Sequence, residues 1–325
     1  MTKSELRKLI RKYENKIKKA KILCIGDIIL DKYIHGKINR MSPEAPVPIF
    51  LAEEESFQIG GVGNVAKNIS RLGGKVTLIY LNGKDSSSKI INNLLLKEKK
   101  IKTEKINSQK FQTPLKIRIT SKSKQIIRID KEISNFKLKT IEEKKILDKV
   151  KKNIKNHDIV LISDYSKGLF SKNIIKKINI IAKKNNKIIL ADPKNIDLSY
   201  YSNLDAITPN EKEITDSFGV KSMTQGELID YALELIKKYK IKNILITRSE
   251  KGMLLINTQY NKKIKSIATQ VNDVTGAGDT VIAVFALMLS MRIDEFNSAL
   301  ISNYAAGLVI KKIGPEAISF EELID

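Results

Sequence analysis

Short apolar runs alternate along the chain with longer segments in which apolar residues recur every three to four positions. The runs are rich in isoleucine, leucine and valine, which is typical of strands buried on both faces of a sheet. The longer segments have the period of amphipathic helices. The apolar runs lie at residues 22–25, 76–81, 159–162, 188–191, 206–208 and 244–247, and the helical segments at 65–72, 141–154, 173–184, 225–239 and 281–289. This alternation predicts βαβ units and an α/β fold, with a central, mostly parallel sheet flanked by helices.

Two segments interrupt this alternation and have the pattern of short strands outside the main sheet. Residues 33–57 contain several prolines and little helical periodicity, and residues 113–130 alternate apolar with polar side chains. We expect a single domain over residues 1–325, in which these two hairpin-like excursions build a small β-sheet that acts as a lid. The alternative is a pair of surface hairpins with no catalytic role.

The chain is strongly basic without a concentrated basic region. Its 325 residues carry a formal net charge of +23, and 42% of them are hydrophobic, as in ordinary folded domains. Lysines are scattered over almost every segment, and no compact run of Lys and Arg is interleaved with aromatic residues. We therefore expect a solvated basic surface and no nucleic-acid partner. A non-catalytic nucleic-acid-binding protein on the same scaffold is the remote alternative.

The features of exported and membrane proteins are also missing from the sequence. No stretch reaches 18 consecutive apolar residues, so we expect neither a membrane span nor a membrane partner. Residues 1–21 are charged and amphipathic and lack the apolar region of a secretory signal. The single cysteine, Cys24, excludes an internal disulfide and fits a reducing compartment, so we expect a cytoplasmic protein.

The most informative stretch is Asp-Val-Thr-Gly-Ala-Gly-Asp at residues 273–279, which precedes an apolar helical run. A glycine-rich turn that leads into a helix exposes backbone N–H groups where the helix dipole favours an anion, typically phosphate. Gly276, Ala277 and Gly278 would supply these groups, and Asp279 would lie beside the anion. A carboxylate in that place can accept the proton of an attacking hydroxyl. A simple helix cap is the alternative.

This string resembles the C-terminal signature of the ribokinase-like (PfkB) carbohydrate kinases. The resemblance implies a ribokinase-like fold and an ATP-dependent kinase in which Asp279 is the catalytic base and residues 276–278 form the anion hole. It also implies a monovalent cation near Asp273 and Thr275, as in some relatives. No Walker A string is present, which disfavours a P-loop kinase, and no Cys/His cluster indicates zinc.

Two further motifs agree with this resemblance on the sugar side and the nucleotide side. Gly-Gly-Val-Gly-Asn at 60–64 resembles the family's sugar-contacting element, which implies that Gly60, Gly61 and Asn64 bind substrate. Asp31, after the first strand, would accept bonds from sugar hydroxyls, the alternative being a solvated loop charge. Asn-Glu-Lys-Glu at 210–213 resembles the Asn-x-x-Glu motif, which implies that Glu213 positions Mg²⁺, often through water; a capping box is the alternative.

The nucleotide site implied by the resemblance draws on several segments of the C-terminal half. A Thr-x-x-x-x-Gly turn follows the strand at 244–247, and Gly314 belongs to a region that walls adenine and ribose in relatives. The cofactor-binding residues implied in this way are Asn210, Glu211, Lys212, Glu213, Thr247, Ser249, Gly252, Thr275, Asn303 and Gly307.

Other strings resemble one branch of the family, the kinases of D-glycero-β-D-manno-heptose 7-phosphate. They lie at 26–31, 40–48 and 163–168, and the resemblance extends over about residues 21–319. It implies transfer of the ATP γ-phosphoryl group to the anomeric hydroxyl, giving the 1,7-bisphosphate for ADP-heptose and lipopolysaccharide synthesis. Many bacterial members carry a C-terminal adenylyltransferase; the His-x-Gly-His motif is missing here, so we expect a stand-alone kinase. A ribokinase-like kinase for another sugar, sugar phosphate or nucleoside is the alternative.

A substrate that already carries phosphate needs a cation near its far end. The motifs favour Lys167, Lys194 and Arg128 as substrate-binding cations, with Arg118 and Arg40 as further candidates. Relatives often pair through their lids, so we expect a homodimer formed through the lid segment 33–57.

Overall fold

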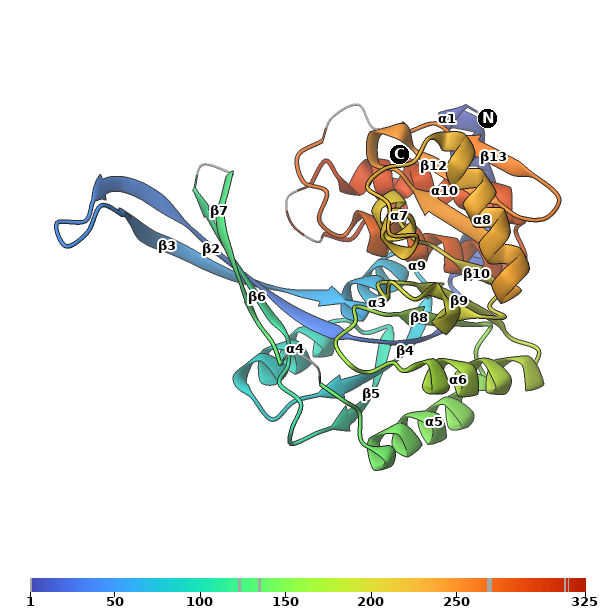
Figure 1. The fold of residues 1–325 in the computed structure, drawn as a ribbon, viewed down its shortest axis with the longest axis horizontal. Helices are drawn as coiled ribbons and strands as arrows, with labels where there is room; N and C mark the ends of the chain where they lie inside the picture. Colours follow the sequence, from blue (N-terminus) through green and yellow to red (C-terminus); the bar gives the residue numbers. More distant parts are fainter. Residues whose placement is uncertain (1, 122–123, 134–135, 268–270, 313, 315) are drawn as a thin grey trace.

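The computed structural model describes residues 2–121, 124–133, 136–267, 271–312, 314 and 316–325. Its centre is a nine-stranded sheet that is parallel from β11 to β5 and antiparallel at β12 and β13 (Figure 1). In spatial order its strands are β13 (Asn261–Ile264), β12 (Met253–Ile256), β11 (Asn243–Thr247), β10 (Ala206–Ile207), β9 (Ile188–Asp192), β8 (Ile159–Ser163), β1 (Lys21–Gly26), β4 (Lys75–Asn82) and β5 (Ile101–Asn107). The predicted parallel sheet is therefore confirmed.

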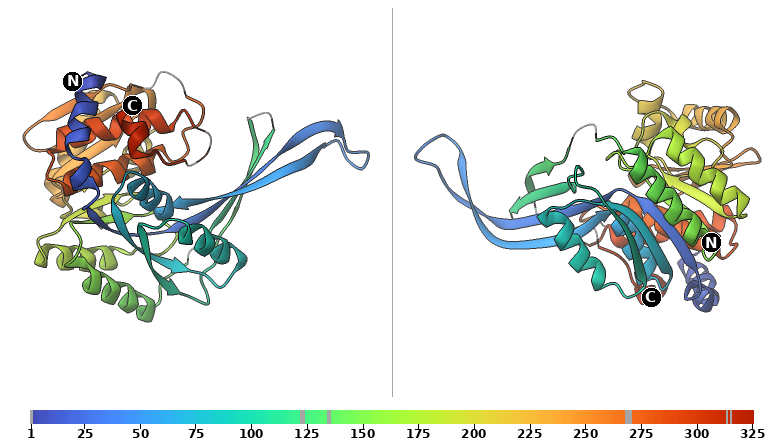
Figure 2. Two further views of the ribbon diagram at one scale, coloured as in Figure 1. Left: turned by 180° about the vertical axis from the view of Figure 1, so that it is seen from behind. Right: turned by 90° about the horizontal axis from the view of Figure 1, so that it is seen from below.

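Helices cover both faces of this sheet because successive side chains of each strand point to opposite faces. Ile22 and Cys24 of β1 belong to one hydrophobic core, and Leu23 and Ile25 to the other. The first face carries α1 (Lys3–Lys12), α2 (Glu14–Ile17), α3 (Val62–Arg71), α4 (Ser86–Leu96), α9 (Ala277–Ser290), α10 (Glu295–Val309) and α11 (Phe320–Ile324), and the second carries α5 (Thr140–Ile154), α6 (Lys172–Lys184), α7 (Glu211–Ser217) and α8 (Gln225–Tyr239) (Figure 2).

Helix α9 is apolar around its whole circumference, which is typical of a helix inside a core. Its residues 279–289 are all buried, between α3, α10 and the sheet. The polar Asp279 and Thr280 at its first turn are therefore held in a packed part of the molecule. Within the described residues, no helix combines the length and the apolar character that a membrane crossing requires.

A second sheet of four strands projects from the body as the long ribbon seen in Figure 1. Its strands in spatial order are β3 (Pro48–Gly61), β2 (Ile28–Met41), β6 (Leu115–Ser121) and β7 (Lys124–Lys131). This four-stranded sheet, called the lid below, confirms the predicted small sheet from segments 33–57 and 113–130. Residues 122–123 of the second segment lie outside the described residues.

The position of Asp31 differs from the expected loop after strand one. Only Asp27 separates β1 from β2, so the chain passes from the large sheet into the lid without a turn. Asp31 lies inside β2 and is paired in register with Gln58 of β3. The polar residues at this point indicate a turn in the sequence. In the structure they belong to one face of β2, because alternate residues of a strand point to opposite faces.

The two faces of the lid differ in chemistry. Asp31 and Arg118 form an ion pair on one face, and Lys116 of the same face places its Nζ atom 5.6 Å from the ring centroid of Tyr165 in the body. The polar face is thus directed at the body. Ile127 and Ile129, of opposite orientation to Arg128, are 50% and 40% exposed, so the other face exposes apolar side chains, along with Lys32, which is paired in register with Ile117.

Candidate active site

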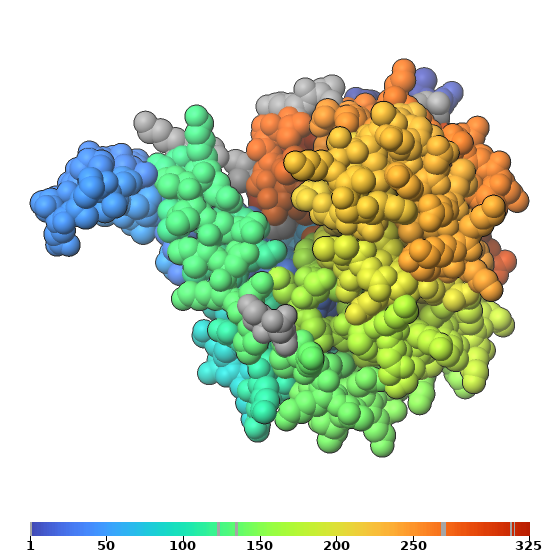
Figure 3. Space-filling view, viewed as in Figure 1, coloured from blue at the N-terminus to red at the C-terminus, as the bar shows by residue number. Residues whose placement is uncertain are grey.

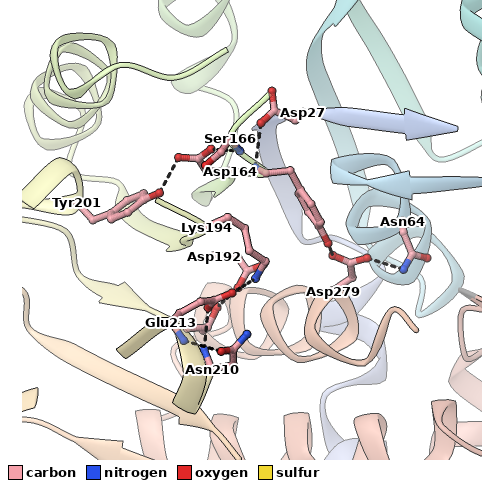
Figure 4. A network of polar contacts seen from close by, with 12 residues as sticks. Asp27, Asn64, Asp164, Ser166, Asp192, Lys194, Tyr201, Asn210, Glu213 and Asp279 are labelled. Carbon is pink, nitrogen blue, oxygen red and sulfur yellow. Dashed lines mark hydrogen bonds and ion pairs between the residues drawn. The ribbon is translucent and has the colours of Figure 1, made fainter. Parts of the chain in front are cut away.

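Asp279 lies buried in the first turn of α9, just after Gly276, whose φ of 80° is readily adopted only by glycine. Its two carboxylate oxygens are held from opposite sides. The hydroxyl of Tyr165 donates to Oδ1 at 2.6 Å, and Nδ2 of Asn64 in α3 donates to Oδ2 at 2.8 Å (Figure 4). Residues from two distant segments therefore fix this carboxylate.

The surroundings of Asp279 bring its pKa close to neutral pH. Burial raises the pKa of Asp279 to about 6, although the hydrogen bonds from Tyr165 and Asn64 favour the charged form and limit the rise. The group is therefore mostly ionised at pH 7, yet more basic than an exposed carboxylate. These properties suit a general base.

Backbone N–H groups surround the same turn. Ala277 donates its N–H to the carbonyl of Val274 at 3.2 Å. The N–H groups of Gly276, Gly278 and Asp279, by contrast, have no acceptor among the described residues. Of the three predicted anion-hole residues, two thus keep a free donor, and Asp279 adds another. The arrangement fits an anion at the N-terminus of a long helix.

A cavity of about 600 Å³ opens in front of this helix terminus. Its lining residues all belong to the body, and Figure 3 shows the hollow between this body and the lid. Of the predicted site residues, the cavity is lined by Lys194, Asn210, Thr247, Ser249, Gly252, Gly276, Ala277, Gly278, Asp279, Asn303 and Gly307, joined by Tyr165 and Asp192. Segments that are far apart in the sequence thus converge on Asp279.

The Asn-x-x-Glu motif forms a capping box and an ion-pair network at once. Asn210 caps α7 by accepting a bond from Glu213 N–H, while Glu213 Oε2 accepts one from Asn210 N–H, both at 2.8 Å. The capping box left open above is therefore confirmed. Glu213 Oε1 lies 2.7 Å from Lys194 Nζ, which also contacts Asp192 at 3.3 Å (Figure 4).

The charged groups of this network shift one another's pKa values. Burial lowers the pKa of Lys194, but the carboxylates of Asp192 and Glu213 outweigh it, and the pKa is raised above its ordinary value. Burial also raises the pKa of Glu213, against the influence of Lys194. The described residues contain no cluster of three or more His, Cys, Asp or Glu side chains arranged for a metal. The donor set fits only a divalent ion that keeps several waters and phosphate oxygens, with Glu213 acting through water.

Glu211 and Lys212 do not line the main cavity. Glu211 forms an ion pair with the buried Arg248 at 2.8 Å, and Lys212 forms an exposed pair with Asp216. Both line a neighbouring, more open pocket of about 640 Å³, which shares Asn210 with the main cavity. Their predicted contact with the cofactor stays a prediction.

In another wall of the cavity, side chains hold the backbone in place through hydrogen bonds. Asn303 donates from Nδ2 to the carbonyl of Lys265 at 2.9 Å. Asp273 accepts bonds from the N–H groups of Thr275 at 2.8 Å and Gly314 at 2.9 Å, so its two oxygens join both loops. Thr275 itself is not among the cavity residues.

On the sugar side the glycines are explained by close approaches. A Cβ on Gly60 would lie 2.2 Å from Asp31 Oδ2, and a Cβ on Gly61, whose φ is 59°, would lie 2.3 Å from the carbonyl oxygen of Asp27. Gly60 thus makes room for the Asp31 carboxylate. Asn64 donates from its amide to Asp279, and its contact with substrate stays a prediction.

Most of the predicted phosphate-binding cations already have carboxylate partners. Lys167 pairs with Glu132 at 2.7 Å and Arg128 with Asp130 at 2.9 Å. Arg40 is exposed near the end of β2. Lys116, which was not predicted, has no ion pair within the described part of the chain. Burial, followed by the nearby cations Lys167 and Arg118, lowers the pKa of Lys116 despite the opposing effect of Asp31.

Comparison with known proteins agrees with this geometry. A family model described as pfkB family carbohydrate kinase matches residues 19–322. The bifunctional protein HldE of Haemophilus influenzae is 38% identical over 312 residues, covering 96% of this chain and 64% of the relative. HldE of Helicobacter pylori is 39% identical over 305 residues, covering 93% of this chain and 65% of the relative. The chain thus spans slightly less than two thirds of these relatives.

Solved structures show the same fold at low identity. Phosphofructokinase-2 from Escherichia coli, in complex with potassium, has a TM-score of 0.79 at 17% identity, covering 94% of this chain and 97% of that one. Ribokinase from Arabidopsis thaliana, complexed with ribose and ATP, has a TM-score of 0.71 at 17% identity, covering 94% and 97%. The chain has the ribokinase-like fold and belongs to the pfkB family of carbohydrate kinases.

Proposed function

We propose that this carbohydrate kinase transfers the γ-phosphoryl group of ATP to the anomeric hydroxyl of D-glycero-β-D-manno-heptose 7-phosphate, giving the 1,7-bisphosphate. The observation that carries the proposal is Asp279, a buried carboxylate with a pKa of about 6 beside free helix N–H groups. The strings at 40–48 and 163–168 and the similarity to HldE support the heptose phosphate. The proposal concerns the kinase reaction, since the family model covers residues 19–322.

In this mechanism Asp279 accepts the proton of the acceptor hydroxyl as its oxygen attacks the γ-phosphorus. The N–H groups of Gly276, Gly278 and Asp279 stabilise the negative charge on the transferring group, since they are oriented before the reaction begins. The ammonium of Lys194 adds positive charge beside the same cavity. ADP leaves as the second product.

The nucleotide would occupy the cavity between α9, α10 and β11, where Thr247, Gly252 and Asn303 form the wall. Glu213 and Asn210 would hold a divalent ion, Mg²⁺ in our proposal, through retained water. The ion would neutralise phosphate charge when bound. Asp31, fixed by Arg118, would accept bonds from sugar hydroxyls at the base of the lid.

A panel of acceptors tests the proposal directly. ADP release is measured with heptose 7-phosphate, fructose 6-phosphate, ribose and a nucleoside under one set of conditions. The heptose phosphate is expected to give the highest kcat/KM. Strong turnover of another acceptor, with none of heptose 7-phosphate, would replace the proposed substrate and keep the kinase assignment.

We predict that Lys116→Met raises the KM for phosphorylated acceptors by ~10–100-fold, the equivalent of one hydrogen bond to a charged group. Lys116 is the cation of the lid's polar face for which no carboxylate partner is described, so it is available for the acceptor's phosphate. Lys32→Met is the matched control, because Lys32 belongs to the same sheet but pairs with Glu55 at 2.7 Å. Equal KM values for the two variants would contradict this role.

We also propose that two copies of the chain pair through their lids. The lid and the loop that joins β2 to β3 expose several large apolar side chains, and exposed apolar surface is a common mark of an interface. They are Ile38, Met41, Val47, Leu51, Ile126, Ile127 and Ile129. Light scattering at micromolar concentration is expected to give the mass of two chains, and Leu51→Lys is expected to reduce it to one. A monomeric mass for the unaltered protein would contradict the pairing.

A further inference from the structure

Tyr165 occupies the centre of the site, although no sequence motif assigned it a role. Its hydroxyl donates to Asp279 Oδ1 at 2.6 Å, which is short for a hydrogen bond and typical of one with a charged acceptor. Its ring lies between two lysines, with Lys116 Nζ at 5.6 Å and Lys194 Nζ at 5.7 Å from the centroid. The side chain thus joins the sugar side, the phosphate side and the base.

The loop that carries Tyr165 is fixed independently of Asp279. Asp27 Oδ2 accepts the N–H groups of Tyr165 at 2.9 Å and Lys167 at 3.1 Å. Asp164 Oδ1 accepts the N–H of Ser166 at 2.8 Å, where the backbone takes a φ of 56°. A non-glycine residue in that conformation costs free energy, so the surrounding contacts must hold it in place. The hydroxyl is therefore directed at Asp279 by a rigid loop.

The direction of this hydrogen bond follows from the charges around it. Burial raises the pKa of Tyr165 well above its ordinary value, and the nearby carboxylates of Asp279 and Asp192 add to the effect. The phenol therefore stays protonated at any working pH and can only donate to the carboxylate. Asn64 occupies the other carboxylate oxygen. Each oxygen keeps a further lone pair for the acceptor hydroxyl.

We propose that Tyr165 is a positioning residue, which holds the Asp279 carboxylate ionised and oriented toward the acceptor hydroxyl. Without the phenol, Asp279 loses a donor that favours its charged form, and only the Asn64 contact still orients it. The other charged groups that act on Asp279 are Asp192, the last residue of β9, and Lys194, which follows that strand. They are unchanged when only the hydroxyl of residue 165 is removed. The inference rests on the proposed role of Asp279 as base.

The test compares Tyr165→Phe with Tyr80→Phe. Tyr80 is a matched control, since its side chain is fully buried in β4 and its hydroxyl also donates to a side-chain oxygen, that of Asn92 in α4 at 3.0 Å, away from the loop that carries Tyr165. For Tyr165→Phe we expect the acid limb of kcat/KM for heptose 7-phosphate to move up by roughly one pH unit. We also expect kcat on the plateau to fall by about tenfold, because orientation is lost. The substrate's own phosphate titrates near pH 6 in every variant, so the difference between variants carries the information.

A second measurement needs no acceptor and separates this inference from the proposed substrate. Carbon-13 NMR of labelled aspartate follows the Asp279 carboxyl in the ligand-free protein, assigned by its loss in Asp279→Asn. Its midpoint is expected to rise in Tyr165→Phe and to stay unchanged in Tyr80→Phe. A fluorinated tyrosine at 165, a stronger donor, should lower it. Failure of heptose 7-phosphate to react would reject the substrate alone.

Two outcomes would overturn the role of Tyr165. The first is an Asp279 carboxyl whose titration is the same in the unaltered protein, Tyr165→Phe and the fluorotyrosine protein. The second is a pair of Phe variants that lose thermal stability and activity to the same extent, with no displacement of the acid limb. Opposite displacements by Phe and fluorotyrosine would support it, because a merely structural hydroxyl does not produce them.

Discussion

Asp279→Asn is expected to lower kcat by at least ~100-fold while ATP binding persists, since general-base catalysis contributes at least that factor. The amide has nearly the same shape as the carboxylate but cannot take up the proton. The N–H groups of Gly276 and Gly278 that face the cavity are untouched by the change. Initial rates and nucleotide titration by calorimetry check the two halves separately. Near-normal turnover would reject Asp279 as the base.

Asp279 is also expected to determine how the reaction rate depends on pH. The pKa of Asp279 is about 6 in the folded protein against 3.8 for an ordinary aspartate. The base works only when ionised, so the rate is expected to fall tenfold per unit below about pH 6. The free energy of unfolding depends on pH in the opposite sense. Folding favours the protonated form of Asp279. The cost of its buried charge therefore appears as the pH rises from about 4 to 6 and persists at higher pH.

Asp279→Asn should therefore be at least as stable as the unaltered protein at pH 8, which thermal unfolding would show. Asp294→Asn is a suitable control, because Asp294 caps α10 on the surface and asparagine caps helices equally well. That variant is expected to keep both activity and stability. A strongly destabilised Asp279→Asn would mean that the rate loss reports unfolding rather than proton transfer.

Lys194→Met is expected to reduce the free energy of unfolding by about 2–3 kcal/mol. Removal of one partner from a buried ion pair costs roughly 3–5 kcal/mol, and the 30% exposure of the Lys194 side chain allows water to screen part of it. Two carboxylates lose their partner at once, since the ammonium contacts both Asp192 and Glu213. Urea unfolding at pH 8 measures the loss.

Lys212→Met is the matched control for this change. Lys212 pairs with Asp216 at 2.8 Å, but its side chain is 80% exposed, and such pairs contribute little. The loss in Lys194→Met should also shrink toward pH 4, because protonated carboxyl groups no longer need the ammonium. Equal stability of the two variants across this pH range would show that the Asp192–Lys194–Glu213 network does not stabilise the fold.

The large sheet and the place of Asp279 at the start of a buried helix could be predicted because their signals are local. β1 and α9 are apolar over their lengths, and the glycine turn precedes Asp279 directly in the chain. The partners of Asp279 could not be predicted in the same way. Tyr165 lies 114 positions away from it and Asn64 lies 215 positions away, so only the fold brings them together.

Other differences have equally physical reasons. The sequence predicts a loop at Asp31 because polar residues follow Leu30. In the structure, polar and apolar side chains alternate along β2, and one of its faces is polar. Lys116 carried no signal at all, because the chain has 59 lysines and arginines and any one of them looks like surface. Its distinguishing property is its place on the polar face of the lid beside the Tyr165 ring, which becomes visible only in three dimensions.

Strand β2 connects the base of the lid with its exposed far end. It runs without interruption in the chain from Asp31, which we propose to bind the sugar, to Met41, in the exposed part of the lid. A partner copy that fixes Met41 would also restrict the positions open to Asp31. By linkage, sugar binding would then strengthen the contact between copies by the same factor by which the contact strengthens sugar binding. Affinity for the acceptor would in that case rise with the concentration of the enzyme itself.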